Sequence, residues 1–215
     1  MRTCLLYTLS DVELRRFLAI AKDDPFYLMY YVDFFTGLRE SELIGLTWDC
    51  IDFAKGTIRM YRQFVRIASG PDKGKMMFTS LKNHKEHTIH PAPSVMDALR
   101  QAKEKQNRQR LLAGSSWDNV YDMVFTRDNG MFIRFKTLYV HFKALVSRLN
   151  RPEVRFHDIR HTYATLAIQS EIDFKTLSLS LGHATVAFTL DTYGHVSNHM
   201  SQNAAAKMEK FIGTL

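Results

Sequence analysis

The sequence predicts a mainly helical fold (α+β) that carries a small antiparallel sheet of about three strands. Apolar residues recur at helical spacing over most of the chain, and short alternating runs occur only between about residues 51 and 91. The 215 residues, 46% of them hydrophobic, are enough to bury one sizeable core. Because no repeat and no Pro/Gly-rich linker divides the chain, we expect one domain over residues 1–215.

The first helices are indicated by the residues at their ends. Ser10 and Glu13 have the spacing of a capping box, and apolar residues follow them at helical spacing. A second helix is predicted through the aromatic-rich stretch 26–35, and Gly37 should end it. A short helix is expected over residues 40–46.

The predicted sheet lies between two groups of helices. Residues 57–61 alternate in polarity, the stretch 70–74 is a cluster of turn residues, and 75–79 and 87–90 are short extended candidates. We therefore predict three antiparallel strands, with a long hairpin between the first two.

The rest of the chain is expected to be helical. Ser94 opens a helix that continues through the basic stretch 100–110, which is equally compatible with a DNA contact and with a solvated face. Residues 128–130, Asp-Asn-Gly, predict a turn. Further helices are predicted at residues 135–149, 157–169, 173–181, 185–192 and 198–213. The last would place on one face Ala204, Met208, Phe211, Ile212 and Leu215.

Composition restricts the classes of function. Lys and Arg number 29 against 22 acidic residues, which gives a formal charge of +7 and favours a polyanionic partner such as nucleic acid. No apolar run reaches the length of a membrane span, and residues 1–10 do not resemble a secretory signal, so no membrane role is expected. Cys4 and Cys50 are interpreted as reduced thiols, which is typical of a cytoplasmic protein.

Four local patterns contain residues suited to phosphoryl transfer. Arg39 follows a glycine turn at the start of a helix, and His157 and Arg160 share one face of another helix. His183 follows a glycine helix stop, and Tyr193 comes ten residues later. Paired guanidinium groups match the charge that builds up on a phosphodiester under attack, and a tyrosine near a positive field or a base can serve as the nucleophile.

The ordered set Arg39, Lys82, His157-x-x-Arg160, Leu181-Gly182-His183 and Tyr193 resembles the tyrosine recombinase (phage integrase) family. Two longer runs match that family as well. They are Thr36-Gly37-Leu38-Arg39, followed by Glu42-Leu43, and the stretch from His157 to Thr165. The resemblance spans about residues 8–196, which leaves 197–215 as a C-terminal helix or tail. It implies the helical catalytic domain of a site-specific recombinase or integrase that needs neither a metal nor another cofactor.

The resemblance also implies roles for the residues that would bind phosphate. Arg39 and Arg160 would clamp the scissile phosphate, and His183 would hydrogen-bond to it. These groups would stabilise the charge that develops when the phosphodiester is attacked.

The remaining implied roles concern bond making and proton transfer. Tyr193 would become joined to the 3′ phosphate, and His157 would assist proton transfer to and from it. Lys82, in the turn between the second and third predicted strands, would protonate the departing 5′ hydroxyl. The segment around this lysine matches the family only loosely, so Lys85 remains a candidate for the same role.

The resemblance extends to partners. It implies double-stranded DNA as substrate, a homo-tetramer on DNA, a monomer without DNA, and a mobile element or prophage as the context. Family members carry an N-terminal DNA-gripping domain that we expect to be absent here, so DNA binding by this chain alone should be weak. The helix at 198–213 would cover the domain's own core or dock on a neighbouring protomer; the sequence leaves both open.

Other functions stay open at this point. A catalytically inactive DNA-binding module and a topoisomerase-like strand-rejoining enzyme are the alternatives, and Tyr139 and Tyr163 are rival tyrosines. A metal-dependent nuclease would need a carboxylate cluster that the sequence lacks. A zinc site is not favoured either. Three histidines lie three positions apart, His84, His87 and His90, and on a strand successive ones would point to opposite faces and could not bind one ion.

Overall fold

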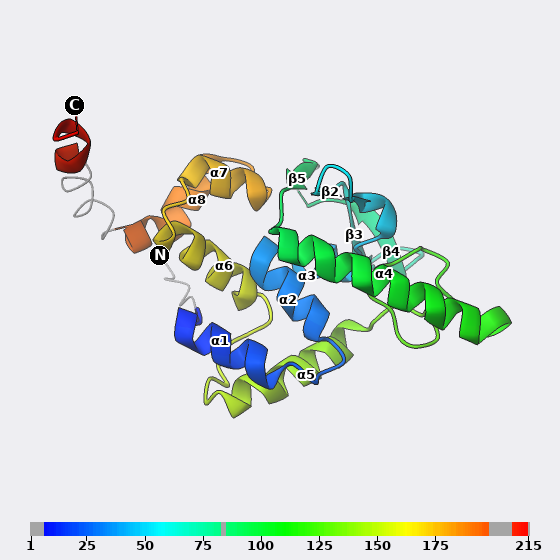
Figure 1. Ribbon diagram of the computed structural model, residues 1–215. Helices are drawn as coiled ribbons and strands as arrows, with labels where there is room; N and C mark the ends of the chain where they lie inside the picture. Colours follow the sequence, from blue (N-terminus) through cyan, green and yellow to red (C-terminus); the bar gives the residue numbers. More distant parts are fainter. Residues whose placement is uncertain (1–6, 83–84, 198–207, 215) are drawn as a thin grey trace.

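The computed structural model describes residues 7–82, 85–197 and 208–214. It is predominantly helical, with two small antiparallel sheets placed together beside the helices (Figure 1). The mainly helical class with a minor sheet is therefore confirmed.

The first helix, α1 (Asp11–Ile20), begins at the predicted capping box. The Ser10 hydroxyl accepts a hydrogen bond from the backbone N–H of Glu13 at 3.2 Å, and the backbone N–H of Ser10 donates to the Glu13 carboxylate at 2.8 Å. Phe17 is fully buried, and its ring packs on Tyr30 of α2 (Tyr27–Thr36) and on Phe142 of α5 (Phe135–Arg148). These aromatic contacts join the three helices into one core.

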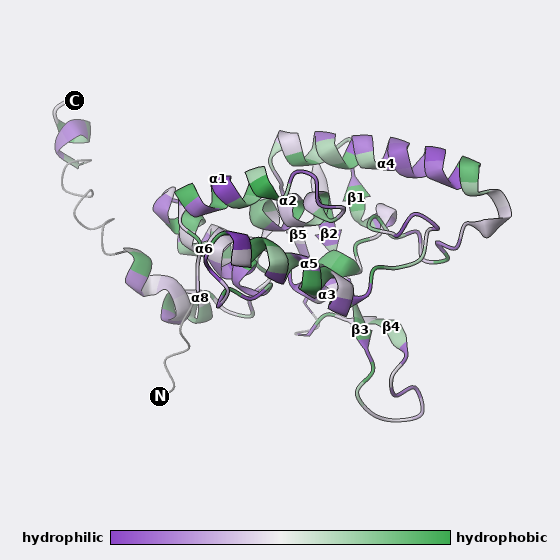
Figure 2. Cartoon of the chain, turned by 90° about the horizontal axis from the view of Figure 1, so that it is seen from below, coloured by the Kyte–Doolittle hydropathy of each residue, from purple (hydrophilic) through white to green (hydrophobic). Residues whose placement is uncertain are grey.

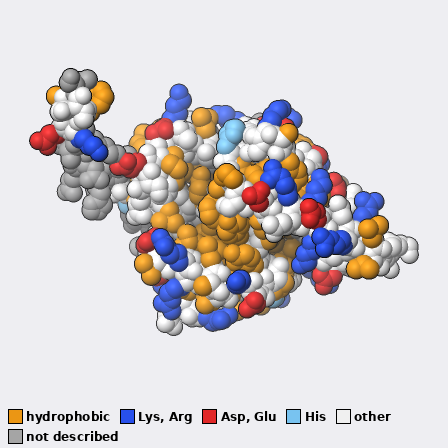
Figure 3. All heavy atoms as spheres, in the orientation of Figure 1, with side chains coloured by type: hydrophobic (Ala, Val, Ile, Leu, Met, Phe, Trp, Pro, Cys, Tyr) orange, Lys and Arg blue, Asp and Glu red, His pale blue; other side chains and the backbone are white. Residues whose placement is uncertain are grey.

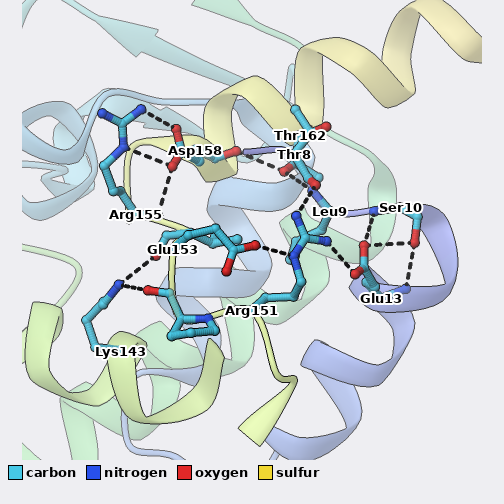
Figure 4. Close-up of polar contacts among 12 residues, drawn as sticks. Thr8, Leu9, Ser10, Glu13, Lys143, Arg151, Glu153, Arg155, Asp158 and Thr162 are labelled. Atoms are coloured by element: carbon cyan, nitrogen blue, oxygen red, sulfur yellow. Dashed lines mark hydrogen bonds and ion pairs between the residues drawn. The ribbon is translucent and has the colours of Figure 1, made fainter. Parts of the chain in front are cut away.

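A polar network holds the start of α1 against the chain around α6 (Asp158–Gln169), as Figure 4 shows. Arg151 forms ion pairs with Glu13 and Glu153 and donates to the backbone carbonyl of Thr8. The backbone N–H of Leu9 donates to the Thr162 hydroxyl at 3.0 Å. The network therefore fixes the place of α6, which carries Arg160 and directly follows His157.

The sheet region differs from the prediction in its pairing. One sheet has the order β1-β2-β5, formed by β1 (Ile51–Asp52), β2 (Thr57–Met60) and β5 (His87–Ile89). The other pairs β3 (Arg62–Arg66) with β4 (Met76–Ser80). The expected pairing of the strand at 57–61 with the strand at 75–79 is thus wrong, because β4 pairs with β3.

Tertiary packing explains this different pairing. Phe64 of β3 is fully buried, and its ring lies 5.0 Å from Phe78 of β4 and 5.2 Å from Phe132. These contacts join residues far apart in sequence, so the local pattern of residues 62–66 did not reveal a strand. The β3–β4 hairpin extends away from the body (Figure 2).

Helix α4 (Pro93–Ala113) extends past the rest of the molecule at its C-terminal end (Figures 1 and 2). Gln106 anchors its middle, accepting from the Trp48 indole N–H at 2.7 Å, while Leu111 and Leu112 near its end are exposed. Figure 3 shows hydrophobic side chains over the middle of one face of the molecule, with Lys and Arg side chains around them. The predicted helix over the basic stretch is confirmed.

A second core cluster holds the C-terminal helices together. Helices α7 (Phe174–Ser180) and α8 (Val186–Tyr193) lie against α6 (Figure 1), and their shared core includes Leu177, Leu181 and Tyr193. The short helices α3 (Glu40–Ile44), η1 (Trp48–Cys50), η2 (Gly114–Ser116) and η3 (Gly194–Ser197) complete the described elements.

The predicted C-terminal helix is described only in its last part. Residues 208–212 are helical, and Met208, Phe211 and Ile212 are all more than half exposed. The stretch 198–207 and Leu215 lie outside the described residues, so docking of this helix stays a prediction. Within the part of the chain that the structure covers, no helix has the length and hydropathy to cross a membrane.

Candidate active site

One cleft of about 460 Å³ brings together all six residues that the sequence singled out. Arg39 precedes α3, Lys82 follows β4, His157 precedes α6, Arg160 is in the first turn of α6, His183 follows α7, and Tyr193 ends α8. The alternative lysine, Lys85, lines an adjoining cavity with Arg59 and His87 instead. The cleft therefore gathers the predicted set from across the fold and contains Lys82 rather than Lys85.

Arg160 is the most buried cation of the cleft, with 4% of its surface exposed. Its guanidinium donates to the backbone carbonyl of Gly37 at 2.7 Å and to that of Leu181 at 2.6 Å. Burial and the neighbouring Arg39 charge lower its pKa to about 10, so the group stays charged at neutral pH. Two carbonyls thus fix the guanidinium, and its remaining N–H groups are left for an anion.

Arg39 is held by a buried carboxylate that sequence reasoning did not select as a site residue. Its guanidinium donates to Glu42 at 2.7 Å and to the Gly182 carbonyl at 3.3 Å, and its backbone N–H also donates to Glu42. Glu42 is fully buried, so a displaced Arg39 would leave a buried carboxylate without its cation. The Arg-x-x-Glu spacing at a helix start was the signal that could have identified this pair.

His183 projects from the turn that follows α7. Gly182 adopts a left-handed φ of 61°, and Nδ1 of His183 shares a hydrogen bond of 2.8 Å with the buried Thr189 hydroxyl. Burial, followed by the charges of Arg160 and Arg39, lowers the His183 pKa to about 3. The ring is therefore neutral at pH 7, and the Thr189 contact fixes its orientation.

Tyr193 is 1% exposed, and its hydroxyl lies 2.7 Å from Nδ1 of His161. Burial raises the pKa of Tyr193 to about 12, although the Arg160 charge acts in the opposite direction. Sequence reasoning did not assign a role to His161. The signal was present, since His161 comes one helical turn after His157 and the two rings meet edge to face at 5.1 Å.

The histidines of α6 are also held neutral. Burial lowers the pKa of His157, with a further contribution from Arg160. Burial and the adjacent His157 lower the pKa of His161 to about 4. Both rings are therefore neutral at pH 7, and the cationic residues that line the cleft are Arg39, Arg160 and Lys82.

The low pKa of His183 predicts a pH-dependent stability. Between the ordinary histidine pKa and the folded value, the unfolded chain binds a proton that the folded chain does not, so stability falls as pH falls. Chemical denaturation at roughly pH 7, 6 and 5 measures the free energy of unfolding. As pH falls, this free energy should decrease more steeply for the wild type than for His183→Gln, by at most about 1.4 kcal/mol per pH unit. Burial raises the pKa of Glu40 to about 6, so this group stabilises the fold as pH falls. Glu40 is present in both proteins, so its contribution cancels when their slopes are compared. Parallel curves for the two proteins would contradict the assignment.

A metal centre has no obvious place among the described residues, where no group of three or more His, Cys, Asp or Glu side chains is arranged to hold an ion. Of the three histidines considered as a zinc site, His84 lies outside the described residues. The ring of His87 packs directly against Gly182, beside the cleft. The expectation that no metal takes part stays a prediction.

Comparisons with known proteins identify relatives of this chain. The model described as "Phage integrase family" matches residues 8–200. A "Tyrosine recombinase XerC-like" protein of Caldanaerobacter subterraneus is 32% identical over 92% of this chain and 52% of its own length. The Tn916 transposase of Enterococcus faecalis is 26% identical over 94% of this chain and 50% of its own. The chain therefore spans about half the length of these curated relatives.

Solved structures show the same fold. The Tn1549 transposon integrase, in complex with transposon right-end DNA, superposes with a TM-score of 0.78 at 22% identity, over 98% of this chain and 67% of that one. The XerA recombinase superposes with a TM-score of 0.67 at 23% identity, over 94% of this chain and 64% of that one.

Proposed function

Because this chain belongs to the phage integrase family, we propose that it cuts and rejoins double-stranded DNA at specific sites through a covalent bond between Tyr193 and a 3′ phosphate. The observation that carries the proposal is the cleft itself. Its lining includes Tyr193, two arginines, a lysine and three histidines, which come from several elements of the fold. Such a set can supply a nucleophile, charge stabilisation and proton donors at one phosphate.

The first step of the reaction is attack on the scissile phosphate. Arg39 and Arg160 would bind its non-bridging oxygens, where negative charge develops, and their fixed positions avoid reorganisation during the reaction. His183 would add a hydrogen bond to the same oxygens, and His157 would assist proton transfer close to Tyr193.

The second part of the reaction concerns the leaving group. Lys82 would protonate the departing 5′ oxygen, and its place in the cleft favours it over Lys85. The phosphotyrosine bond retains the energy of the phosphodiester, so a 5′ hydroxyl from another strand can attack it and rejoin the DNA. The steps assigned here use side chains alone, without a cofactor.

The proposal extends to context and assembly. Relatives named as transposon transposases, and a neighbour solved with transposon-end DNA, support a mobile element or prophage as the setting and the cytoplasm as the place of action. We propose that residues 8–196 form the catalytic core and that 197–215 form a C-terminal helix or tail. The chain would be a monomer without DNA and a homo-tetramer on DNA. Docking of residues 198–215 on a neighbouring protomer belongs to the same proposal.

Covalent trapping on nicked DNA tests the proposed function. The chain is mixed with nicked duplexes that carry candidate attachment sequences, with EDTA throughout, and adducts are resolved on denaturing gels. We expect an adduct with the wild type and none with Tyr193→Phe, because phenylalanine has no nucleophilic oxygen. The matched control is Tyr139→Phe, which removes the hydroxyl of a tyrosine that is 48% exposed and should leave the adduct intact.

Other outcomes would contradict the proposal in different ways. An adduct that persists in Tyr193→Phe would move the nucleophile to another residue. An adduct that forms only when EDTA is omitted and a divalent metal is supplied would favour a metal-dependent enzyme. Specific DNA binding without an adduct on any substrate would favour the inactive binding module.

A further inference from the structure

We propose that His161, and not His157, takes the proton of the Tyr193 hydroxyl when that oxygen attacks phosphorus. This inference rests on the proposed function and assigns one further catalytic residue to it. It gives the bond-forming step a defined proton acceptor within the same chain.

The contact between the two residues is direct and buried. The Tyr193 hydroxyl lies 2.7 Å from Nδ1 of His161, and the two ring centroids are 5.7 Å apart. Among the described residues, no other side chain forms a hydrogen bond with this phenol oxygen. The tyrosine ends α8 and the histidine lies in α6, so the packing of two helices, rather than a mobile loop, sets the distance.

The protonation states match transfer in this direction. A phenol with a pKa near 12 keeps its proton at pH 7, whereas an imidazole with a pKa near 4 is neutral there and has one free lone pair. In the tautomer that carries its proton on Nε2, Nδ1 of His161 accepts this hydrogen bond from the phenol. This hydrogen bond already lies along the path that the proton would follow.

The reaction balances with this acceptor. The Tyr193 oxygen forms a bond to phosphorus while the bond from phosphorus to the 5′ oxygen breaks, and its electron pair leaves with that oxygen. The phenol proton moves to Nδ1 of His161, and Lys82 gives a proton to the 5′ oxygen. Religation is the reverse, in which His161 returns its proton to the tyrosine.

Bound DNA would make the transfer easier. Without DNA, the large gap between the two pKa values keeps Tyr193 protonated. Arg160 and the ring of His157 disfavour a positive charge on His161, whereas Asp158 favours one. A phosphate held by Arg39 and Arg160 brings negative charge into the cleft and so raises the basicity of His161. Tyr193 would thus be activated mainly when its substrate is in place.

His157 is placed for a different task. It lines the cleft, and its ring meets the ring of His161 edge to face. The structure records no hydrogen bond between His157 and Tyr193 among the described residues. His157 is thus placed to donate to the phosphate or to exchange a proton with His161.

The test measures single-turnover adduct formation on two nicked duplexes. One has the ordinary scissile phosphate, and the other has sulfur in place of its bridging 5′ oxygen. A thiolate leaves without protonation, so this substrate removes the need for a general acid but not for a base. His161→Ala should lose about 10²–10⁴-fold on both substrates, whereas Lys82→Ala should lose activity on the oxygen substrate and recover on sulfur.

A pH profile separates base catalysis from a structural role. The rate of His161→Ala should rise about tenfold per pH unit above roughly pH 7, as hydroxide takes over from the missing base, whereas the wild type should be nearly flat. The titratable and charged groups around His161 all remain in the variant; they are Tyr193, His157, Asp158, Arg160, Arg155 and His183. His161→Asn provides a second variant in case His161→Ala does not fold.

The outcomes are distinguishable. The role of His161 as base would be overturned if His161→Ala formed the adduct within about threefold of the wild-type rate. It would also be overturned if the rate loss of His161→Ala disappeared on the sulfur substrate. A wild type that forms no adduct would instead refute the proposed function. A His161→Ala loss with a flat pH profile would reduce His161 to a residue that positions the phenol.

Discussion

Arg160→Lys is expected to lower the rate of Tyr193–DNA adduct formation by about 10²–10³-fold. The guanidinium uses two N–H groups on the carbonyls of Gly37 and Leu181, and Arg160 lines the cleft. A lysine ammonium is a single point of charge and cannot bridge the two carbonyls while also forking around a phosphate. Single-turnover trapping on a nicked duplex measures the loss.

The same substitution should also destabilise the fold. Arg160 is buried, and at least one of the two carbonyls that it satisfies would lose its partner, at a cost of about 1–3 kcal/mol. The matched control is Arg148→Lys, which alters an exposed arginine that also donates to a backbone carbonyl, that of Ile20. We expect adduct formation in the control to stay within about twofold of the wild type. A loss below tenfold for Arg160→Lys would show that positive charge alone is sufficient at this position.

Gly37→Ala is expected to lower the free energy of unfolding by roughly 3 kcal/mol. Gly37 ends α2 with φ of 60°, which is unfavourable for any residue with a Cβ. A Cβ at this position would lie 2.4 Å from Cδ1 of the partly buried Tyr163 and 2.9 Å from Cδ2 of the buried Leu181, so these side chains would have to move. The carbonyl of Gly37 would move with them and disturb Arg160.

Gly56→Ala separates backbone strain from steric contact. Gly56 has a similar φ of 65°, but a Cβ there would meet nothing within 4 Å. Gly56→Ala should therefore lower the free energy of unfolding by only about 1–2 kcal/mol, which is the cost of holding a residue with a Cβ in the left-handed region. Urea unfolding of both variants measures the difference, and equal losses would mean that the Tyr163 contact relaxes without cost.

Local patterns were sufficient for most of the elements. The capping box at Ser10, the stop at Gly37 and the helical spacing of residues 135–193 predicted helices close to those observed, because caps, turns and amphipathic faces are encoded within a few residues. The strand pairing failed because β3 is held by Phe64 against Phe78 and Phe132, a contact that no local window contains.

The sequence by itself determined the helical class, because that class follows from residue types at short spacings. Through the resemblance to a known family it also determined the six candidate residues that meet in the cleft. Only the tertiary structure decided how those residues are held. Arg160 reaches a carbonyl 123 positions away, and His161 meets a tyrosine 32 positions away. Such pairings depend on how helices pack rather than on neighbouring residues, so the contact between His161 and Tyr193 became visible only in the folded chain.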